Sequence, residues 1–220
     1  MKKLLFLLGI TYLFAGFPEY YYKLPVSKQK KEFEKILFPM IQKENKRILQ
    51  LREKIISIFN DPSFIFDTNK IIFLAKVARI YKIKDIYNKE EFLKKIDMIP
   101  PKLVLAQGAI ESGWGRSYFV KKANNIFGQW DYTSNGLMPR NRDANATHTV
   151  RIFRSLDDSL RVYIRNLNRN RAYRKFRELR YEYKKQHKIF SAEVAATTLR
   201  EYSELGEEYV KRLQKMIKQF

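Results

Sequence analysis

The chain has 220 residues, enough to bury a core without metals or disulfides, and its 45% hydrophobic and 15% aromatic content excludes a disordered chain. It has no cysteine and two histidines, which excludes disulfides and argues against a zinc site; we expect no metal and no cofactor. The net charge of +21 attracts polyanions, of which nucleic acid, anionic cell wall and lipid head groups are candidates. A simple solvated surface is an equal alternative.

The first 17 residues have the pattern of an export signal. Lys2 and Lys3 precede a mostly apolar run from Leu4 to Phe17. That run is shorter than the roughly 20 residues of a membrane-spanning helix. We predict a cleaved signal, or an inner-membrane anchor through residues 4–17, and hence a periplasmic or cell-envelope location; a buried N-terminal helix is the alternative. Export weighs against nucleic acid as the partner.

The first half of the remaining chain is predicted to be helical. Residues 18–27 contain two prolines and predict a linker, and residues 28–89 form an N-terminal helical region. Apolar residues at helical spacing predict one long helix over 28–59, which Pro39 kinks or splits and which Asp61-Pro62 ends.

Shorter helices are predicted to follow. They cover residues 68–81, 90–95 and 102–112, and Gly113 and Gly115 end the last of these.

Residues 90–220 are predicted to form a second domain with a loop-rich insertion. Turn-forming residues crowd 116–150, and alternation over 148–153 predicts one short strand. Ser155 with Asp158 resembles a capping box, after which helices are predicted at 156–168, 171–186, 191–201 and 205–219. The fold class is therefore mostly α, and an insertion between helical halves favours a substrate groove.

Glu111 is the candidate general acid. It stands at the end of the 102–112 helix, among small and apolar residues that solvate it poorly. Desolvation penalises a charged carboxylate and raises its pKa, as a proton donor near neutral pH requires. A surface glutamate is the alternative, but its charge would oppose the helix dipole.

Several motifs, in order, carry a family resemblance. Leu105-Ala-Gln-Gly-Ala-Ile-Glu-Ser-Gly-Trp-Gly115 is followed by Asn125-Ile-Phe-Gly-Gln-Trp130, by Ala146-Thr-His148 and by Tyr202-Ser-Glu-Leu-Gly206. Together they resemble the glucosaminidase family of peptidoglycan hydrolases, in particular its Bax-like branch, over roughly residues 28–220. The family's annotated name is often mannosyl-glycoprotein endo-β-N-acetylglucosaminidase-like.

The resemblance implies a lysozyme-like fold with a groove between two helical lobes. It implies hydrolysis of the β-1,4 bond between N-acetylglucosamine and N-acetylmuramic acid in peptidoglycan strands, with Glu111 protonating the leaving oxygen. Tyr202 matches the family tyrosine that lines the cleft near the acid.

Aromatic residues in the insertion are candidate sugar platforms. Trp130 and Tyr132 offer flat faces that suit pyranose rings, although core packing is an equal alternative for Trp130. Gln129 could bind a sugar amide or brace the loop. Asn125, Phe127 and Gly128 are expected to shape the loop, and Trp114 to pack in the core.

The second catalytic group is left open. Two-carboxylate glycosidases need a partner across the scissile bond, and the acids of the insertion are Asp131 and Asp143. We take Asp143 as the candidate, with His148 behind it. The substrate's N-acetyl group could assist instead. Lytic transglycosylation and a non-catalytic basic wall- or nucleic-acid-binding module are the alternative functions.

Overall fold

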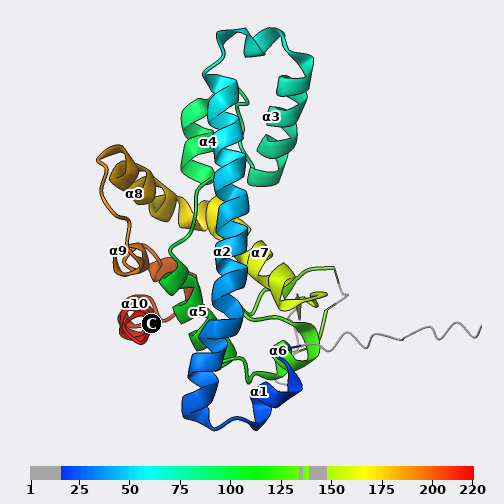
Figure 1. The fold of residues 1–220 in the computed structure, drawn as a ribbon, viewed down its shortest axis with the longest axis vertical. Coiled ribbons are helices and arrows are strands. Elements are labelled where there is room, and N and C mark those ends of the chain that lie inside the picture. The colour runs from blue at the N-terminus through cyan, green and yellow to red at the C-terminus, as the bar shows by residue number, and fades with distance from the viewer. Residues whose placement is uncertain (1–15, 134–135, 139–147) are drawn as a thin grey trace, which may run out of the picture.

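One long helix, α2 (Val26–Phe59), forms the axis of the fold (Figure 1). The structure, a computed structural model, describes residues 16–133, 136–138 and 148–220. Several of the other helices lie along α2 or cross it, and the last helices of the chain pack on these neighbours. One face of α2 is buried at three- and four-residue intervals, the pattern of an amphipathic helix; its fully buried apolar members are Phe33, Leu37, Ile41 and Ile55.

Pro39 lies inside α2 without splitting it, so of the two predicted outcomes, a kink or a split, the split is wrong. Pro39 is exposed, whereas Leu37 and Ile41 on either side of it are fully buried. A proline inside a helix costs about 3 kcal/mol. Each buried aliphatic side chain contributes about 1.5–3 kcal/mol, so packing on both sides of Pro39 offsets that loss.

The predicted linker over residues 18–27 is also wrong. It contains helix α1 (Glu19–Lys23) and the start of α2. Tyr21 is fully buried, and Phe17 stacks on the rings of Tyr21 and Phe33 at centroid distances of 4.4 and 5.5 Å. These aromatic rings bind the segment to the core.

Most of the predicted export segment, residues 1–15, lies outside the described residues. Its last residue, Phe17, belongs to the core instead. Within the described ranges, no helix combines the length and the apolar character needed to cross a membrane.

The C-terminal half of α2 carries a group of short helices at one end of the molecule (Figure 1). These are the 3₁₀ helix η1 (Pro62–Phe66), α3 (Thr68–Tyr81) and α4 (Lys89–Lys95). Asp67 caps α3 by accepting hydrogen bonds from the backbone N–H groups of Asn69 and Lys70. The predictions over 68–81 and 90–95 are confirmed.

The next segment passes from helix α5 (Pro101–Ser112) through α6 (Tyr118–Ala123) into a two-stranded antiparallel sheet of β1 (Trp130–Asp131) and β2 (Thr149–Val150). Helix α6 falls where only loop was predicted. The sequence feature that marks the start of α6 is Ser117, which caps the helix by accepting a hydrogen bond from Val120 N at 3.2 Å.

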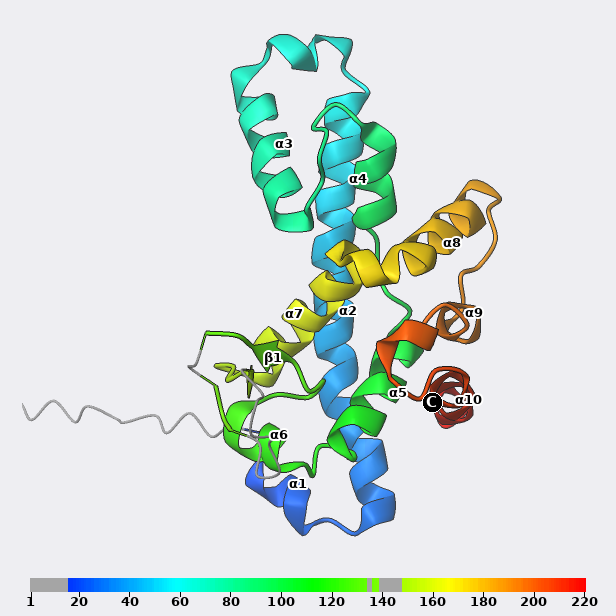
Figure 2. The same ribbon diagram turned by 180° about the vertical axis from the view of Figure 1, so that it is seen from behind.

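The chain ends with helices that cross α2 and then pack on α5 (Figure 2). They are α7 (Leu156–Arg169), η2 (Arg171–Tyr173), α8 (Arg174–Lys185), α9 (Ala192–Ala196), η3 (Arg200–Tyr202) and α10 (Glu207–Ile217). Helices are present in all four predicted segments, but the one predicted over 191–201 is α-helical only over Ala192–Ala196, and the one predicted over 171–186 begins with a 3₁₀ turn. The mostly α fold class is confirmed.

Close packing joins the two predicted domains into one core. Gly108 of α5 faces α2, and a Cβ atom there would lie 3.4 Å from Phe33 Cζ and 3.3 Å from Ile126 Cγ2. Glycine therefore lets the helix that carries Glu111 approach the axis of the fold closely.

Candidate active site

Glu111 lies in the last turn of α5 and opens onto a cleft of about 810 Å³. The end of α3, the β1 loop, one face of α7, η2 and η3 supply the other walls. Among the residues that the structure describes, Glu111 is the only acid that lines this cleft. The predicted groove is therefore present, and the predicted acid faces it.

The turn after Glu111 is held in one conformation. Gly113 ends α5 with φ +56° and faces open space, while Ser112 Oγ donates to Gly108 O and accepts from Gly115 N at 2.7 Å. A Cβ atom at Gly115 would lie 2.4 Å from the ring of Phe17. The structure thus explains why both positions of the Glu-Ser-Gly-Trp-Gly motif are glycine: Gly113 has a positive φ, and Gly115 leaves room for Phe17.

The carboxyl group of Glu111 is half-buried, and burial raises its pKa above the usual 4.5. Two groups act against this: Tyr209, which donates a hydrogen bond to Oε1 at 3.0 Å, and the positive charge of Arg212. Desolvation is the largest effect, so the pKa stays raised. Such an acid holds its proton closer to neutral pH than a solvated glutamate does.

A chain of hydrogen bonds fixes the orientation of Glu111. Tyr163 Oη donates to Gln107 Oε1, Gln107 Nε2 donates to Tyr209 Oη at 2.9 Å, and Tyr209 Oη donates to Glu111 Oε1. Because the Gln107 amide occupies Tyr209 as an acceptor, the one phenolic proton of Tyr209 points to Glu111. Oε1 therefore acts as an acceptor, so that in the protonated form of Glu111 the proton sits on Oε2.

A layer of tyrosines surrounds the carboxyl group. Tyr202 stacks on Tyr209 with ring centroids 5.3 Å apart, and the Tyr173 ring lies 6.0 Å from that of Tyr202. Burial, with a contribution from the Glu111 charge, raises the pKa of Tyr173 to about 12 and that of Tyr202 well above 10. These phenols stay neutral at any working pH and act as hydrogen-bonding or stacking groups.

Comparison with known proteins identifies the family. The sequence model of the glucosaminidase family, described as mannosyl-glycoprotein endo-beta-N-acetylglucosaminidase, matches residues 88–220. The chain belongs to the glucosaminidase family. The matched segment contains Glu111 and every residue of the hydrogen-bond chain.

The chain is also similar to Protein bax of Escherichia coli (strain K12), with 29% identity over 189 residues. That match covers 82% of this chain and 66% of the relative, just under two thirds of the relative's length. No solved structure matches the chain significantly.

The aromatic residues predicted as sugar platforms lie at the cleft. Trp130 and Tyr132 line it and are 52% and 78% exposed, so neither is a core residue. The Trp130 ring lies 3.2 Å, between centroids, from that of His148. An exposed ring on the wall of a cleft supports the platform interpretation of Trp130 over core packing.

The structure favours a bracing role for Gln129. Its side-chain amide donates to Ser159 O at 3.0 Å and accepts from Ser159 Oγ at 2.9 Å, although the residue also lines the cleft. Asn125 bonds to Gln129 and to Arg151 O, which confirms that it shapes the loop. Trp114 packs against Phe33 of α2, as predicted.

No second acid faces Glu111 among the described residues. Asp131 lies outside the cleft lining, and its Oδ1 accepts from the backbone and hydroxyl of Thr133, which lowers its pKa. Asp143 lies outside the described residues. Within the described ranges, no three or more His, Asp or Glu side chains gather as a metal site would require.

Sequence reasoning missed two residues that act on Glu111. Gln107 and Glu111 are four residues apart on α5 and therefore share a helix face, a signal that was present in the sequence. Tyr209 follows Tyr202 by seven residues, but an irregular stretch separates the two, so no helical periodicity links them.

Proposed function

We propose that this glucosaminidase-family chain is an exported peptidoglycan hydrolase that cleaves the β-1,4 bond between N-acetylglucosamine and N-acetylmuramic acid, with Glu111 as the general acid. The observation that carries the proposal is the raised pKa of Glu111, the one acid that lines the cleft in the described chain. The family match supports a glycosidase.

The geometry suggests how the proton moves. Glu111 donates the proton from Oε2 to the glycosidic oxygen as the bond to the anomeric carbon breaks. The carboxylate that forms keeps the hydrogen bond from Tyr209 on Oε1, and that bond strengthens as negative charge develops. Tyr209 therefore stabilises the product of proton transfer more than the neutral acid.

Two groups are candidates for the second step. Asp143 could activate water, or the N-acetyl group of the substrate could attack the anomeric carbon. Lytic transglycosylation is the second candidate function, because it works with one glutamate and Glu111 is the one acid seen in the described lining. The products separate these reactions.

The test is digestion of purified sacculi by the wild type and by Glu111→Gln, with product ends identified by mass spectrometry. Reducing N-acetylglucosamine ends from the wild type, and a loss of activity of about 100-fold or more in the variant, are expected. Glu178→Gln, a change at an exposed glutamate on α8, is the matched control and should retain full activity.

Other outcomes are equally informative. Anhydromuramic ends would show transglycosylation instead. Activity that survives in Glu111→Gln would remove Glu111 from the mechanism. Binding without cleavage by both proteins would show a non-catalytic wall-binding module.

Export is a separate part of the proposal and rests on the Lys2-Lys3 start and the apolar run to Phe17. Cell fractionation with N-terminal sequencing of the mature chain tests it. A new N-terminus near residue 16 in the envelope fraction indicates a cleaved signal, and an intact N-terminus in the membrane fraction indicates an anchor. A chain found intact in the cytoplasm would refute export.

A further inference from the structure

The face of α7 that borders the cleft carries two arginines without an ionic partner. Arg165 and Arg169 line the cleft, and neither side chain forms an ion pair or hydrogen bond with a residue that the structure describes, although the charge of Arg165 opposes the rise that burial causes in the pKa of Glu44 on α2. Arg161 on the same helix differs, because it forms ion pairs with Glu44, Asp157 and Asp158. The lack of an ion pair therefore distinguishes these two arginines from Arg161 on the same helix.

Other groups on this wall suit an anion. Arg165 and Arg169 are both half-buried and lie four residues apart, so they are on adjacent turns about 6 Å apart along the axis. Asn166 and Asn170, one position further on, also line the cleft. Like charges at this spacing repel each other, and a bound anion would remove that repulsion.

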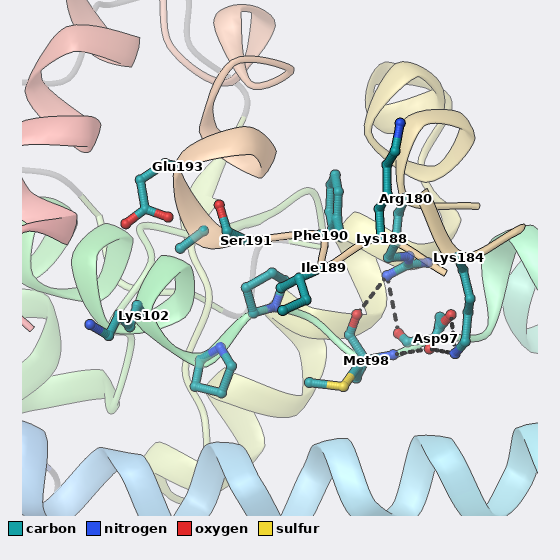
Figure 3. A pocket seen from close by; sticks show the side chains of 13 residues that line it. Asp97, Met98, Lys102, Arg180, Lys184, Lys188, Ile189, Phe190, Ser191 and Glu193 are labelled. Atoms are coloured by element: carbon teal, nitrogen blue, oxygen red, sulfur yellow. Dashed lines mark hydrogen bonds and ion pairs between the residues drawn. The ribbon is translucent and has the colours of Figure 1, made fainter. Parts of the chain in front are cut away.

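A second hollow on the molecule contains basic side chains that are bonded to the protein itself. It measures about 540 Å³ and lies between the α4–α5 connection and the α8–α9 turn (Figure 3). There the Asp97 carboxylate accepts both hydrogen bonds of Lys184, at 2.9 and 3.0 Å, and Arg180 donates to backbone carbonyls. Those cations are neutralised by the protein itself.

We propose that Arg165 and Arg169 bind a carboxylate carried by the glycan, so that the cleft selects an acidic amino-sugar polymer over a neutral one. This inference rests on the proposed function and names the substrate feature that it requires. Arginine binds carboxylates through paired N–H donors, and a half-buried site screens the interaction less than open solvent does. Lys82 and Arg151, which also line the cleft, add to the positive electrostatic potential there.

The carboxylate has two sources in such a polymer. One is the lactyl group of muramic acid when no peptide is attached, and the other is the stem peptide amide-linked to that group. The free lactyl group places its negative charge beside the sugar ring, whereas the stem peptide carries its carboxylates further from the ring. Either source satisfies the proposal, and the choice of substrates distinguishes them.

The test uses three glycans of the same alternating sugar sequence and length. The first has free lactyl carboxylates, the second has the same groups as neutral methylamides, and the third has stem peptides. We compare kcat/KM of the wild type and of Arg165→Gln/Arg169→Gln on each. Dissociation constants are measured by calorimetry in the Glu111→Gln background, where cleavage does not interfere.

The wild type should prefer at least one carboxylate-bearing glycan over the methylamide by about tenfold, which corresponds to about 1.4 kcal/mol. The double variant should lose this preference, so that its kcat/KM on the carboxylate-bearing glycans falls to its value on the methylamide. Arg165→Lys/Arg169→Lys should keep part of the preference, because the charge remains but the paired donors do not. Arg171→Gln, an exposed arginine outside the cleft lining, should change nothing.

Equal treatment of all three glycans by the wild type, or a preference that survives in the folded double variant, would overturn the inference while leaving the glycosidase function intact. If the wild type cleaves none of the glycans, the proposed function fails; the calorimetric preference then decides the inference by itself. Circular dichroism melting curves establish that each variant is folded.

Discussion

The cleft at Glu111 and the hollow at Asp97 are both lined with basic residues, but the fold treats their charges differently. At Asp97, every buried charge has a partner: Arg52 lies 3.4 Å from its carboxylate, and Arg180 donates four hydrogen bonds, to Lys94 O, Asp97 O, Met98 O and Asn168 Oδ1. In the cleft, the Arg165 and Arg169 side chains form no ion pair within the described chain, and Arg165 interacts with Glu44 only through its charge, which opposes the rise that burial causes in the pKa of Glu44.

The difference separates groups that hold the fold together from groups that are available to a ligand. A buried charge is stable only when it is paired and hydrogen-bonded. Burial lowers the pKa of Arg180 to about 10, and the Asp97 charge acts against this effect. Glu111 shows the opposite arrangement, because its burial is not matched by an ion pair and its pKa rises. Hollows of similar appearance can therefore be distinguished by their unpaired groups.

The largest expected effect concerns stability at the structural hollow. Asp97→Ala leaves Arg52 and Arg180 buried without their counter-charge. The free energy of unfolding should fall by about 3–5 kcal/mol, measured by urea denaturation. Glu178→Ala, which removes an exposed pair with Arg174, is the control and should change it by less than about 0.5 kcal/mol. A similar small change for Asp97→Ala would contradict the structural role of the cluster.

The next effect concerns the hydrogen bond to the acid. Tyr209→Phe removes the donor to Glu111 Oε1, and kcat should fall about 10- to 100-fold because the forming carboxylate loses a charge-assisted bond. Since this bond lowers the pKa of Glu111, its removal raises that pKa, and the alkaline limb of the pH–rate profile should move to higher pH. Tyr87→Phe, at an exposed tyrosine, is the control.

A profile that keeps its alkaline limb in Tyr209→Phe would show that Glu111 does not control that limb. Loss of stability without any shift in pH dependence would assign Tyr209 a packing role only. Both results would weaken the assignment of Glu111 as the acid that is oriented by the hydrogen-bond chain.

A smaller effect is expected at the sugar platform. Trp130→Ala should raise KM about fivefold, because one stacked ring contributes about 1 kcal/mol. Stability should barely change, since the ring is half exposed. Steady-state kinetics and a melting curve on the same variant decide whether Trp130 stacks on a sugar or packs in the core. An unchanged KM with a strongly lowered melting temperature would show that Trp130 serves packing instead.

The smallest effect concerns the stability cost of the acid itself. A raised pKa means that the folded protein disfavours the ionised Glu111 carboxylate more than the unfolded chain does. The folded state is therefore destabilised when Glu111 ionises, as the pH rises from the pKa of the unfolded chain through that of the folded protein. Glu111→Gln avoids this destabilisation. Its melting temperature should exceed that of the wild type at pH 8 by more than at pH 4. A difference in melting temperature that is no larger at pH 8 than at pH 4 would contradict the direction of the pKa shift.

Local patterns predicted most of the helices. The helix over 68–81 agrees with α3 residue for residue, because Asp67 caps its start and its apolar residues recur at helical spacing. The errors came where long-range packing overrode a local signal. Pro39 remains in a helix because core contacts lie on both sides. Residues 18–25 are packed because Phe17 stacks on Phe33 of α2 and because Tyr21 donates a hydrogen bond to Trp114 O, 93 positions along the chain.

The sequence by itself determined the mostly α class, the position of Glu111 at a helix end and the glycine turn that follows it, because each depends on residues within a few positions of one another. Only the tertiary structure decided what surrounds that carboxyl group. Tyr209 lies 98 positions from Glu111, and α7 lies more than 40 positions beyond it. Their arrangement around the cleft depends on helices packing across α2, which local sequence periodicity does not specify.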